Sequence, residues 1–363
     1  MRDGWKNSKV APTANAERNL GIVVRNLAAD EEPLWDAFVR DVPGTSFLHL
    51  LGWRRVIERT LGHSTHYRTA WRGGRLVGIL PLVQVRSRLF GHALFSPGFG
   101  VFAGIAAVDE PATKALADDA AALGVALRVD YIELRHEKPR AIDWPERRNS
   151  FATFQRALSP SVDANFKAIP RKKRADLRKA IDNRTLQVST GIDVATFFGV
   201  YSHSVRNLGT PVLPFAYYRA IAEELGPAVE ISAVHGPDGL VAAVMSFHFK
   251  DRVSPYYGGA FPWARRLHAY DLMYWDVMRR ATERGIQIFD FGRSMIGSGA
   301  FDYKTYWGFT PEPLHYNYHL VSATTLPEVD PRNPKYHLMV NLWKKLPLFA
   351  ANLMGPIIAR QIG

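Results

Sequence analysis

The chain of 363 residues contains no cysteine, which excludes disulfides, thiolate metal ligands and a cysteine nucleophile. It also lacks an uninterrupted run of about 18 apolar residues, the length that a membrane-spanning helix requires. Its N-terminal stretch MRDGWKNSKVAPTANAERNL is polar and has no apolar core of a signal peptide. We therefore expect a cytoplasmic protein whose residues 1–19 are disordered.

Motifs of metalloenzymes and serine hydrolases are missing as well. The chain has 12 histidines but no H-E-x-x-H sequence, and no G-x-S-x-G turn that would expose a serine nucleophile. Its closely spaced histidines are His63 with His66 and His315 with His319, which we interpret as structural residues. We predict no metal site.

The composition favours a folded protein with an anionic partner. Hydrophobic residues make up 47% of the chain, and its length exceeds that of a usual single domain, so we expect two domains. The formal net charge of +12 favours nucleic acid, a phosphorylated small molecule or an acidic membrane surface as partner. The alternative is that the positive charge only keeps the protein soluble.

Two segments of the chain follow the same plan, which predicts a duplicated α/β domain. Residues 65–135 and 228–293 each read as strand, glycine turn, strand, further strand, helix and apolar strand. The turns RGGRL and GPDGL suit hairpins between β-rich runs. We predict two domains at 20–160 and 161–325, each a mixed sheet flanked by helices, followed by a proline-rich linker and a terminal segment at 326–363.

Between the two copies lies a strongly basic stretch, residues 165–184, that we expect to form one helix. Only Asp176 and Asp182 oppose its many cations, so most of the positive charge is unmatched within the helix. The stretch has few aromatic residues, which argues against stacking of single-stranded nucleic acid. Either Arg171, Arg174 and Arg178 bind an anionic ligand, or the run is a solvated helix face.

Residues 288–309, IFDFGRSMIGSGAFDYKTYWGF, place polar groups directly after a buried strand. Asp290 and Arg293 fall at the end of that strand, where the ligand crevice of an open α/β sheet lies. The GSG that follows has neither the dinucleotide nor the P-loop spacing, and no helix pattern comes after it. We expect Lys304 on a strand or hairpin beyond this turn.

Together with the duplicated plan, four motifs resemble the FemAB-like transferases, which are built of tandem GNAT-type acyltransferase domains. The likeness covers residues 47–363 and is greatest to the FemAB-like proteins associated with exosortase/PEP-CTERM gene clusters. The motifs are IPRKKRADLRKA, RNLGTPVLP, the stretch 288–309 with EPLHYNYHL, and the tail NPKY with WKKLPLFAANLMGPIIARQIG.

The resemblance implies a role for Lys304 near the reacting carbonyl or a substrate phosphate, because the family carries a lysine before an aromatic–glycine–aromatic turn. A fixed cation there stabilises the negative charge that acyl transfer builds on the carbonyl oxygen. Asp290 or a water would accept the proton, and Arg293 lies beside them. The alternatives are that Lys304 is a solvated hairpin lysine and that Asp290 only binds backbone groups or Arg293.

Substrate-binding residues are implied in the same way. The loop SVRNLGTPVLP resembles the family's substrate-cleft loop, so Arg206 would clamp a phosphate or carboxylate, with Thr210 beside it. The alternative is a helix C-terminus capped by Gly209. Tyr303 and Trp307 would form the floor of the cleft.

The acyl donor is left between two classes. The loop that usually holds the coenzyme A pyrophosphate corresponds to ARRLHAYDLMYW, where His268 and Tyr270, or Ala269 and Asp271, stand in place of small residues. This departure disfavours coenzyme A, and Fem-type enzymes that use aminoacyl-tRNA also lack the full loop. We expect no tightly bound cofactor, with acyl-CoA or aminoacyl-tRNA as the donor.

The C-terminal stretch from Leu342 to Ile362 is mostly apolar and begins with a tryptophan and two lysines. Its two prolines and Arg360 make it a poor membrane span, but it suits a peripheral contact with the inner face of a membrane, where a lipid-linked substrate would be met. The alternative, which we favour from sequence, is that it packs on the second domain.

These observations predict an acyl or aminoacyl transferase that moves an activated acyl group to an amine of a cell-envelope or exopolysaccharide-related substrate. The alternatives are an acyl-CoA-dependent N-acetyltransferase of small molecules and a non-catalytic binding protein for a phosphorylated saccharide or lipid carrier. Binding of tRNA would fit the positive charge, either as donor or by itself.

Overall fold

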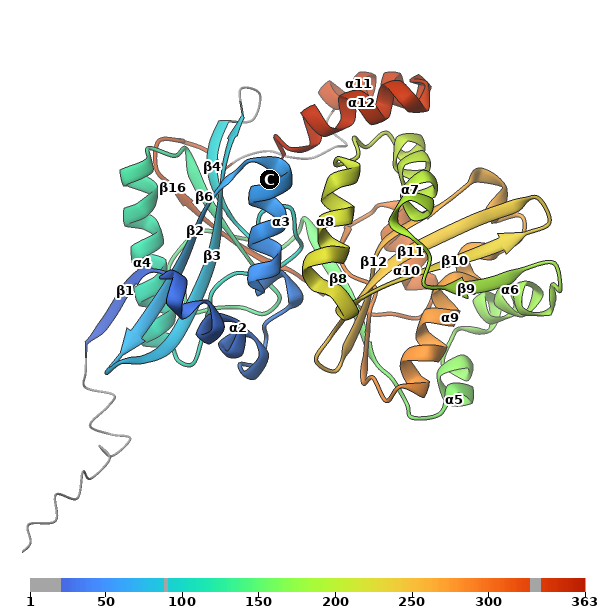
Figure 1. Ribbon diagram of the computed structural model, residues 1–363, viewed down its shortest axis with the longest axis horizontal. Coiled ribbons are helices and arrows are strands. Elements are labelled where there is room, and N and C mark those ends of the chain that lie inside the picture. Colours follow the sequence, from blue (N-terminus) through green and yellow to red (C-terminus); the bar gives the residue numbers. More distant parts are fainter. Residues whose placement is uncertain (1–20, 88–90, 327–333, 363) are drawn as a thin grey trace, which may run out of the picture.

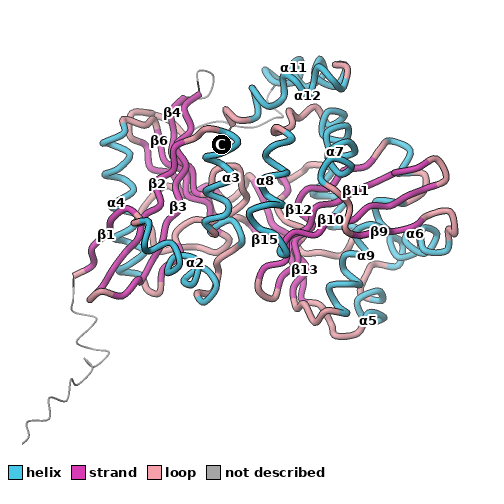
Figure 2. The backbone as a smooth tube through the Cα atoms, viewed as in Figure 1, coloured by secondary structure: helices cyan, strands magenta, loops and turns pink. Residues whose placement is uncertain are grey.

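The protein consists of two mixed β-sheets, each flanked by helices, in a computed structural model that describes residues 21–87, 91–326 and 334–362. Figures 1 and 2 show the two units side by side, with the helices α3 and α8 between the sheets. The predicted fold class is confirmed. The predicted disorder of residues 1–19 and most of the predicted linker lie outside the described residues.

The first sheet has the strand order β1-β2-β3-β4-β6-β16-β7, with β5 paired to β3. Its helices are α2 (Glu32–Asp41), α3 (Leu51–Leu61) and α4 (Glu110–Leu127). Its strands are β1 (Ile22–Asn26), β2 (Ser64–Arg72), β3 (Arg75–Ser87), β4 (Gly91–Ser96), β5 (Ala106–Ala107), β6 (Tyr131–His136), β7 (Glu146–Arg147) and β16 (His315–Leu320).

The second sheet has the order β14-β8-β13-β12-β11-β10-β9, with β15 paired to β8. Its strands are β8 (Phe151–Ala157), β9 (Gln187–Thr190), β10 (Val229–Gly236), β11 (Gly239–Phe249), β12 (Arg252–Ala260), β13 (Ile288–Asp290), β14 (Ser294–Met295) and β15 (Pro311–Pro313). Its helices are α5 (Val162–Lys167), α6 (Arg171–Asp182), α7 (Val194–Leu208), α8 (Phe215–Leu225), α9 (Ala269–Glu283) and α10 (Gly299–Tyr306).

The repeated plan is present in both sheets. In each unit a meander of antiparallel strands is followed by a helix and then by a strand that pairs in parallel, β4 with β6 and β12 with β13. The hairpins form at the predicted turns: Gly73 and Gly74 have positive φ between β2 and β3, and Gly239 does so at the start of β11. Glycine adopts these angles without steric cost.

The two units exchange strands, so the sheets do not divide at the predicted boundary between residues 160 and 161. Strand β8 precedes that boundary but pairs with β13, β14 and β15 of the second sheet. Strand β16 lies in the predicted second domain but pairs with β6 and β7 of the first. Hydrophobic patterning shows that a segment is a strand, but it does not show which sheet the strand joins.

A shared hydrophobic core holds the units together. Phe47 of the first unit stacks on Phe247 of the second with ring centroids 4.1 Å apart, and Trp53 contacts the edge of Tyr217. Around these rings the helices α3 and α8 pack closely, with an ion pair between Arg55 and Glu224 at 2.6 Å. Because this packed core is continuous between the units, it holds the two sheets in a fixed position relative to each other.

The predicted basic helix is two helices. Helix α5 ends at Lys167 and α6 begins at Arg171, with Pro170 as its N-cap residue. Proline disfavours a helical conformation at the residue before it, which ends α5 early.

The C-terminal segment forms two helices, α11 (Pro334–Lys345) and α12 (Leu348–Ala359), which pack on α7 of the second unit. This confirms the packed alternative. The helices that the structure describes are all too short or too polar to cross a bilayer.

Candidate active site

The candidate site lies where the parallel pair β12–β13 comes apart. Pairing between these strands joins Arg252 to Ile288 and Val253 to Phe289, and beyond this point the strands diverge. The opening leads into a cavity of about 510 Å³, here named the Lys304 pocket, between Tyr256–Gly258 and Asp290–Ser294. Among the described residues, no strand pairs with this edge of β12 beyond Val253, so backbone groups there can bond a ligand.

Lys304 projects into this pocket from helix α10, not from the strand or hairpin that the sequence predicted. Ser298 starts the helix by accepting a hydrogen bond from the Phe301 N–H at 3.2 Å, so the serine of the GSG turn is an N-cap. The aromatic residues after it favour a strand by propensity, and packing of Phe301 against Phe154 decides for the helix.

The Lys304 ammonium group is held by backbone carbonyls. Its Nζ donates to the carbonyl oxygens of Gly292 and Arg293, each at 3.0 Å, and it lies 5.5 Å from the centre of the Phe154 ring. Burial lowers the pKa of Lys304 to about 7, and the nearby Asp290 carboxylate opposes that shift. Lys304 therefore changes charge near neutral pH.

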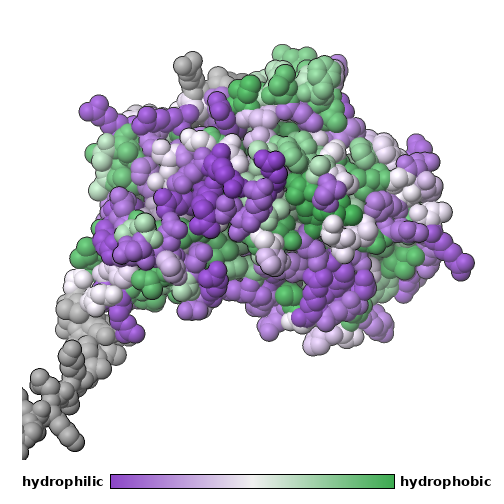
Figure 3. All heavy atoms as spheres, in the orientation of Figure 1, coloured by the Kyte–Doolittle hydropathy of each residue, from purple (hydrophilic) through white to green (hydrophobic). Residues whose placement is uncertain are grey.

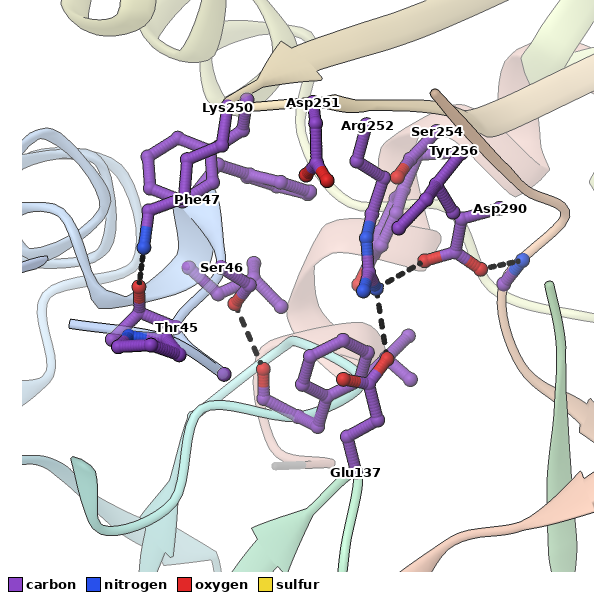
Figure 4. A pocket seen from close by; sticks show the side chains of 18 of the residues that line it. Thr45, Ser46, Phe47, Glu137, Lys250, Asp251, Arg252, Ser254, Tyr256 and Asp290 are labelled. Carbon is purple, nitrogen blue, oxygen red and sulfur yellow. Dashed lines mark hydrogen bonds and ion pairs between the residues drawn. The ribbon is translucent and has the colours of Figure 1, made fainter. Parts of the chain in front are cut away.

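Asp290 is enclosed by partners on both of its oxygens. One oxygen accepts from the backbone N–H of Gly292 at 2.8 Å, and the other forms an ion pair with Arg252 at 3.1 Å. Arg252 also pairs with Glu137 of the first unit at 2.8 Å, as Figure 4 shows. Burial raises the pKa of Asp290, and Arg252 opposes this shift. The ion pairs fix this carboxylate between the units, and they involve Arg252 rather than Arg293.

Arg293 contributes positive charge to the Lys304 pocket. Its guanidinium donates to the hydroxyl of Tyr316 at 3.0 Å and lies over the Phe151 ring. The charged residues that line the pocket are Arg135, Arg293, Lys304 and Asp290, of which Arg135 is paired with Glu133 and Asp290 with Arg252. Arg293 and the protonated form of Lys304 are therefore the cations that a substrate meets there. The pocket therefore favours a substrate that carries negative charge.

Of the predicted substrate-binding residues, Thr210 lines the Lys304 pocket and Arg206 does not. The guanidinium of Arg206 donates to the carbonyl of Leu346 at 2.9 Å, so it holds the end of α11 rather than a ligand. Gly209 caps α7 with φ of 85°, as the alternative expected. The sequence of this loop is typical both of a substrate-binding loop and of a capped helix end. Only the position of the C-terminal tail, which supplies the partner of Arg206, distinguishes the two roles.

Tyr303 and Trp307 belong to the core of the second unit and do not form a cleft floor. Trp307 is fully buried in the cluster that includes Phe291, and the Tyr303 hydroxyl donates to Asp271 at 2.6 Å. Lys304 lines the pocket, whereas Tyr303 and Trp307, four positions apart and therefore near one face of the helix, pack in the core of the second unit.

The basic helix α6 lies away from the Lys304 pocket. Figure 1 places it on the side of the second unit remote from the first. Arg174 donates to the carbonyl of Ile169 at 3.2 Å and caps the turn between α5 and α6, while Arg178 lies over the Phe166 ring. Arg171 is exposed to solvent. The structure does not bring these arginines together with Lys304.

Sequence reasoning missed the residues at the junction of the two units. Arg252 and Glu137 bridge the sheets, and the buried pair Arg135–Glu133, at 2.6 Å, borders the pocket. Behind Asp290 lies a second cavity of about 550 Å³, here named the Lys250 pocket, which shares Asp290 and Gly292 with the first. A signal was available: charges at alternate positions of the otherwise apolar strand YIELRH indicate a polar lining.

The four histidines interpreted as structural have ordinary partners. His63 donates to the carbonyl of Arg360 at 2.7 Å, and His66 contacts Gln84. His315 pairs with Glu146, and His319 packs on Trp144. Within the described part of the chain, no group of three or more histidine, aspartate or glutamate residues is placed to hold a metal ion.

The start of α9 fits a coenzyme A pyrophosphate poorly. The backbone N–H of Ala264 donates to the carbonyl of Phe261, and those of Arg266, Leu267 and His268 donate to carbonyls of the short helix Pro262–Arg265. The Asp271 carboxylate occupies the first turn of α9. A diphosphate needs free N–H groups and the absence of a carboxylate there.

Comparison with known proteins agrees with this architecture. Residues 164–305 match the acetyltransferase (GNAT) domain family. No curated protein matches the sequence. The fold resembles the crystal structure of FemX, with 14% identity and a TM-score of 0.65, over 88% of this chain and all of that one.

Two further solved structures share the fold. A tandem GNAT protein from the clavulanic acid biosynthesis pathway has 10% identity and a TM-score of 0.54, over 84% of this chain and all of that one. A conserved protein of unknown function from Bacteroides thetaiotaomicron has 12% identity and a TM-score of 0.55, over 83% of this chain and all of that one. The chain thus has the GNAT-type acyltransferase fold in tandem.

Proposed function

From a tandem GNAT fold with an enclosed lysine in its cleft, we propose that the protein is an acyl or aminoacyl transferase whose chemistry takes place in the Lys304 pocket. The observation that carries this proposal is the Lys304 amine, held by two carbonyls at the end of β13 with its pKa lowered to about 7. A surface lysine would keep its charge at neutral pH. A lysine that titrates near 7 suits proton transfer.

The hydrogen bonds of Lys304 define what it presents to the pocket. Two N–H groups are committed to the carbonyls of Gly292 and Arg293. In the neutral amine the remaining position carries a lone pair, and in the ammonium form it carries a third N–H. Lys304 can therefore accept the proton of an attacking amine and then donate a hydrogen bond to the carbonyl oxygen or the leaving group.

The proposed reaction is a direct displacement. The acceptor nitrogen bonds to the acyl carbon, the bond from that carbon to the donor oxygen or sulfur breaks, and the proton of the amine passes to Lys304 and on to the leaving group. Asp290 stays paired with Arg252 and fixes the end of β13. Arg293 holds an anionic part of a substrate.

The substrates are proposed by class. The positive charge of Arg293 in the pocket fits an acceptor with phosphate or carboxylate groups. An amine of a cell-envelope or exopolysaccharide-related compound fits this charge and the resemblance to FemAB-like proteins. The poor fit of a diphosphate at α9 favours aminoacyl-tRNA or another activated ester over acyl-CoA as donor, so no step is assigned to coenzyme A.

The proposal is tested by donor consumption. Because the chain has no cysteine, thiol release from acetyl-CoA can be followed with a disulfide dye without a background from the protein. Loss of radiolabel from a mixture of aminoacyl-tRNAs tests the ester donors in parallel, with and without amine acceptors.

We expect amine-dependent consumption of one donor class, and a loss of about 100-fold in Lys304→Met, the usual scale for removing a general base. The matched control is Lys138→Met, because Lys138 is a surface lysine paired with Glu312. Equal rates in Lys304→Met and wild type would refute the assignment. Coenzyme A binding with micromolar affinity would favour the N-acetyltransferase alternative.

A further inference from the structure

The two tail helices have an inner face that is built to stay attached to the second unit. Ala351, Gly355 and Ala359 are buried and recur every four residues along α12. A Cβ on Gly355 would lie 2.9 Å from the carbonyl oxygen of Val212, so the backbones approach closely. With Arg206 bonded to the carbonyl of Leu346, the tail is a fixed part of the fold.

The outer face of the same helices is apolar and exposed. Phe349 and Leu353 have 76% and 73% of their surfaces accessible, one helical turn apart on α12. Figure 3 shows hydrophobic residues gathered over the top of the molecule, where Figure 1 places α11 and α12. This outer surface, named the tail surface, comprises Leu338, Met339, Leu342, Phe349, Leu353, Met354 and Ile357. A contiguous patch of this kind marks an interaction site.

The charge of the tail favours one kind of partner. Residues 334–362 contain no aspartate or glutamate, and their cations include Lys344, Lys345 and Arg360. Both lysines are exposed at the junction of α11 and α12. Apolar side chains next to cations, without any acid, match an anionic lipid surface, where each cation contributes about fivefold to partitioning. A second copy docked through the same surface would bring these cations together without an acid of the tail to pair them.

The tail also reaches the mouth of the Lys304 pocket. Ala359 and Ile362 at the end of the chain line that pocket. The carbonyl of Arg360 accepts from His63 and the side chain of Gln361 accepts from Ser87, so the end of α12 is tied to the first unit. One continuous segment thus carries both the tail surface and part of the pocket wall.

We propose that the tail surface docks on an anionic bilayer and holds the mouth of the Lys304 pocket at the lipid headgroups. A lipid-carried substrate then reaches Lys304 along α12 without leaving the membrane. The docking itself depends only on the tail surface, whereas the delivery of a lipid-carried substrate rests on the proposed transferase function.

Vesicle flotation of the full chain tests the docking. The probes are vesicles of phosphatidylcholine alone and of phosphatidylcholine with about 30% phosphatidylglycerol. We expect flotation with the anionic vesicles, a loss of at least tenfold in the double variant Phe349→Glu with Leu353→Glu, and a smaller loss in Lys344→Gln with Lys345→Gln. The matched control is Val125→Glu, which changes an exposed apolar residue of α4 and should float like wild type.

Two outcomes would overturn the docking: no flotation of wild type, or equal flotation of the Phe349 and Leu353 variant. Light scattering gives a further check, because a dimer of wild type that this variant dissociates would assign the tail surface to self-association instead. Lys304→Met should float like wild type. If wild type floats normally but consumes no donor, the transferase proposal alone is refuted. If wild type consumes donor with soluble acceptors but does not float, the docking alone is refuted.

Discussion

The lowered pKa of Lys304 leads to a measurable dependence of stability on pH. The amine ordinarily has a pKa of 10.5, and burial lowers it to about 7 in the folded protein. Between these two values the unfolded chain binds more protons than the folded chain, so stability rises with pH through this window. At and below pH 7, burial of the Lys304 amine lowers the free energy of unfolding by its largest amount.

The size of the effect follows from the shift. Each pKa unit corresponds to about 1.4 kcal/mol, so the cost of the lowered pKa at pH 7 is about 4 kcal/mol. Lys304→Met removes the titrating group and keeps most of the packing volume. The variant should therefore be more stable than wild type at pH 7 by an amount on the order of 2–4 kcal/mol, after loss of the two hydrogen bonds to carbonyls.

The assay is urea unfolding of wild type and Lys304→Met at several pH values between 6.5 and 9.5. The gap between the two free energies of unfolding should narrow by about 1.4 kcal/mol for each unit that the pH rises above 7. Lys138→Met controls for the loss of a lysine at the surface. If the difference in free energy of unfolding between the two proteins stays constant with pH, Lys304 does not have a lowered pKa. That result would also refute its role in proton transfer.

Three further predictions concern the frame around the site. Arg252→Met leaves the carboxylates of Glu137 and Asp290 without their common partner and should lower the free energy of unfolding by about 3 kcal/mol, measured in urea. Trp307→Ala should cost about 3–5 kcal/mol in the same assay, since the ring is fully buried, whereas Trp307→Phe should keep donor consumption near wild type if the ring is core rather than substrate floor. Burial lowers the pKa of His136 from 6.5 to about 3, so the stability that depends on neutral His136 is complete above pH 6.5 and is lost as the pH falls. Between pH 6.5 and 5 the free energy of unfolding should fall by about 2 kcal/mol for this reason. His136→Gln should therefore show a smaller decline in thermal midpoint over that range.

The duplicated fold could be predicted from the sequence because its signals are local. Hairpin glycines, apolar runs and the helix before each parallel strand all lie within a few residues of the structure that they specify. The strands β8 and β16 show the limit. Their exchange between the sheets depends on pairing over more than a hundred residues, which no local pattern encodes.

At the candidate site, three residues that the sequence singled out line one pocket, and several other predicted side chains lie elsewhere. Asp290, Arg293 and Lys304 do meet at one pocket, because the end of a strand and the turn after it are close in sequence. Arg206 is a basic residue in a plausible loop, and its partner is the carbonyl of Leu346, which is remote in the chain. Trp307, the C-cap residue of α10, is buried in the core of the second unit and does not line the pocket with Lys304.

The sequence by itself determined the absence of cysteine chemistry, the two α/β units, the positive charge and the amphipathic tail, since each depends on composition or short-range periodicity. The tertiary structure decided which charges are matched, which amine is enclosed and which apolar face stays exposed. Burial and the partners of a side chain are properties of its surroundings. The lowered pKa of Lys304 and the exposed tail surface beside its pocket therefore emerge only when distant segments are brought together.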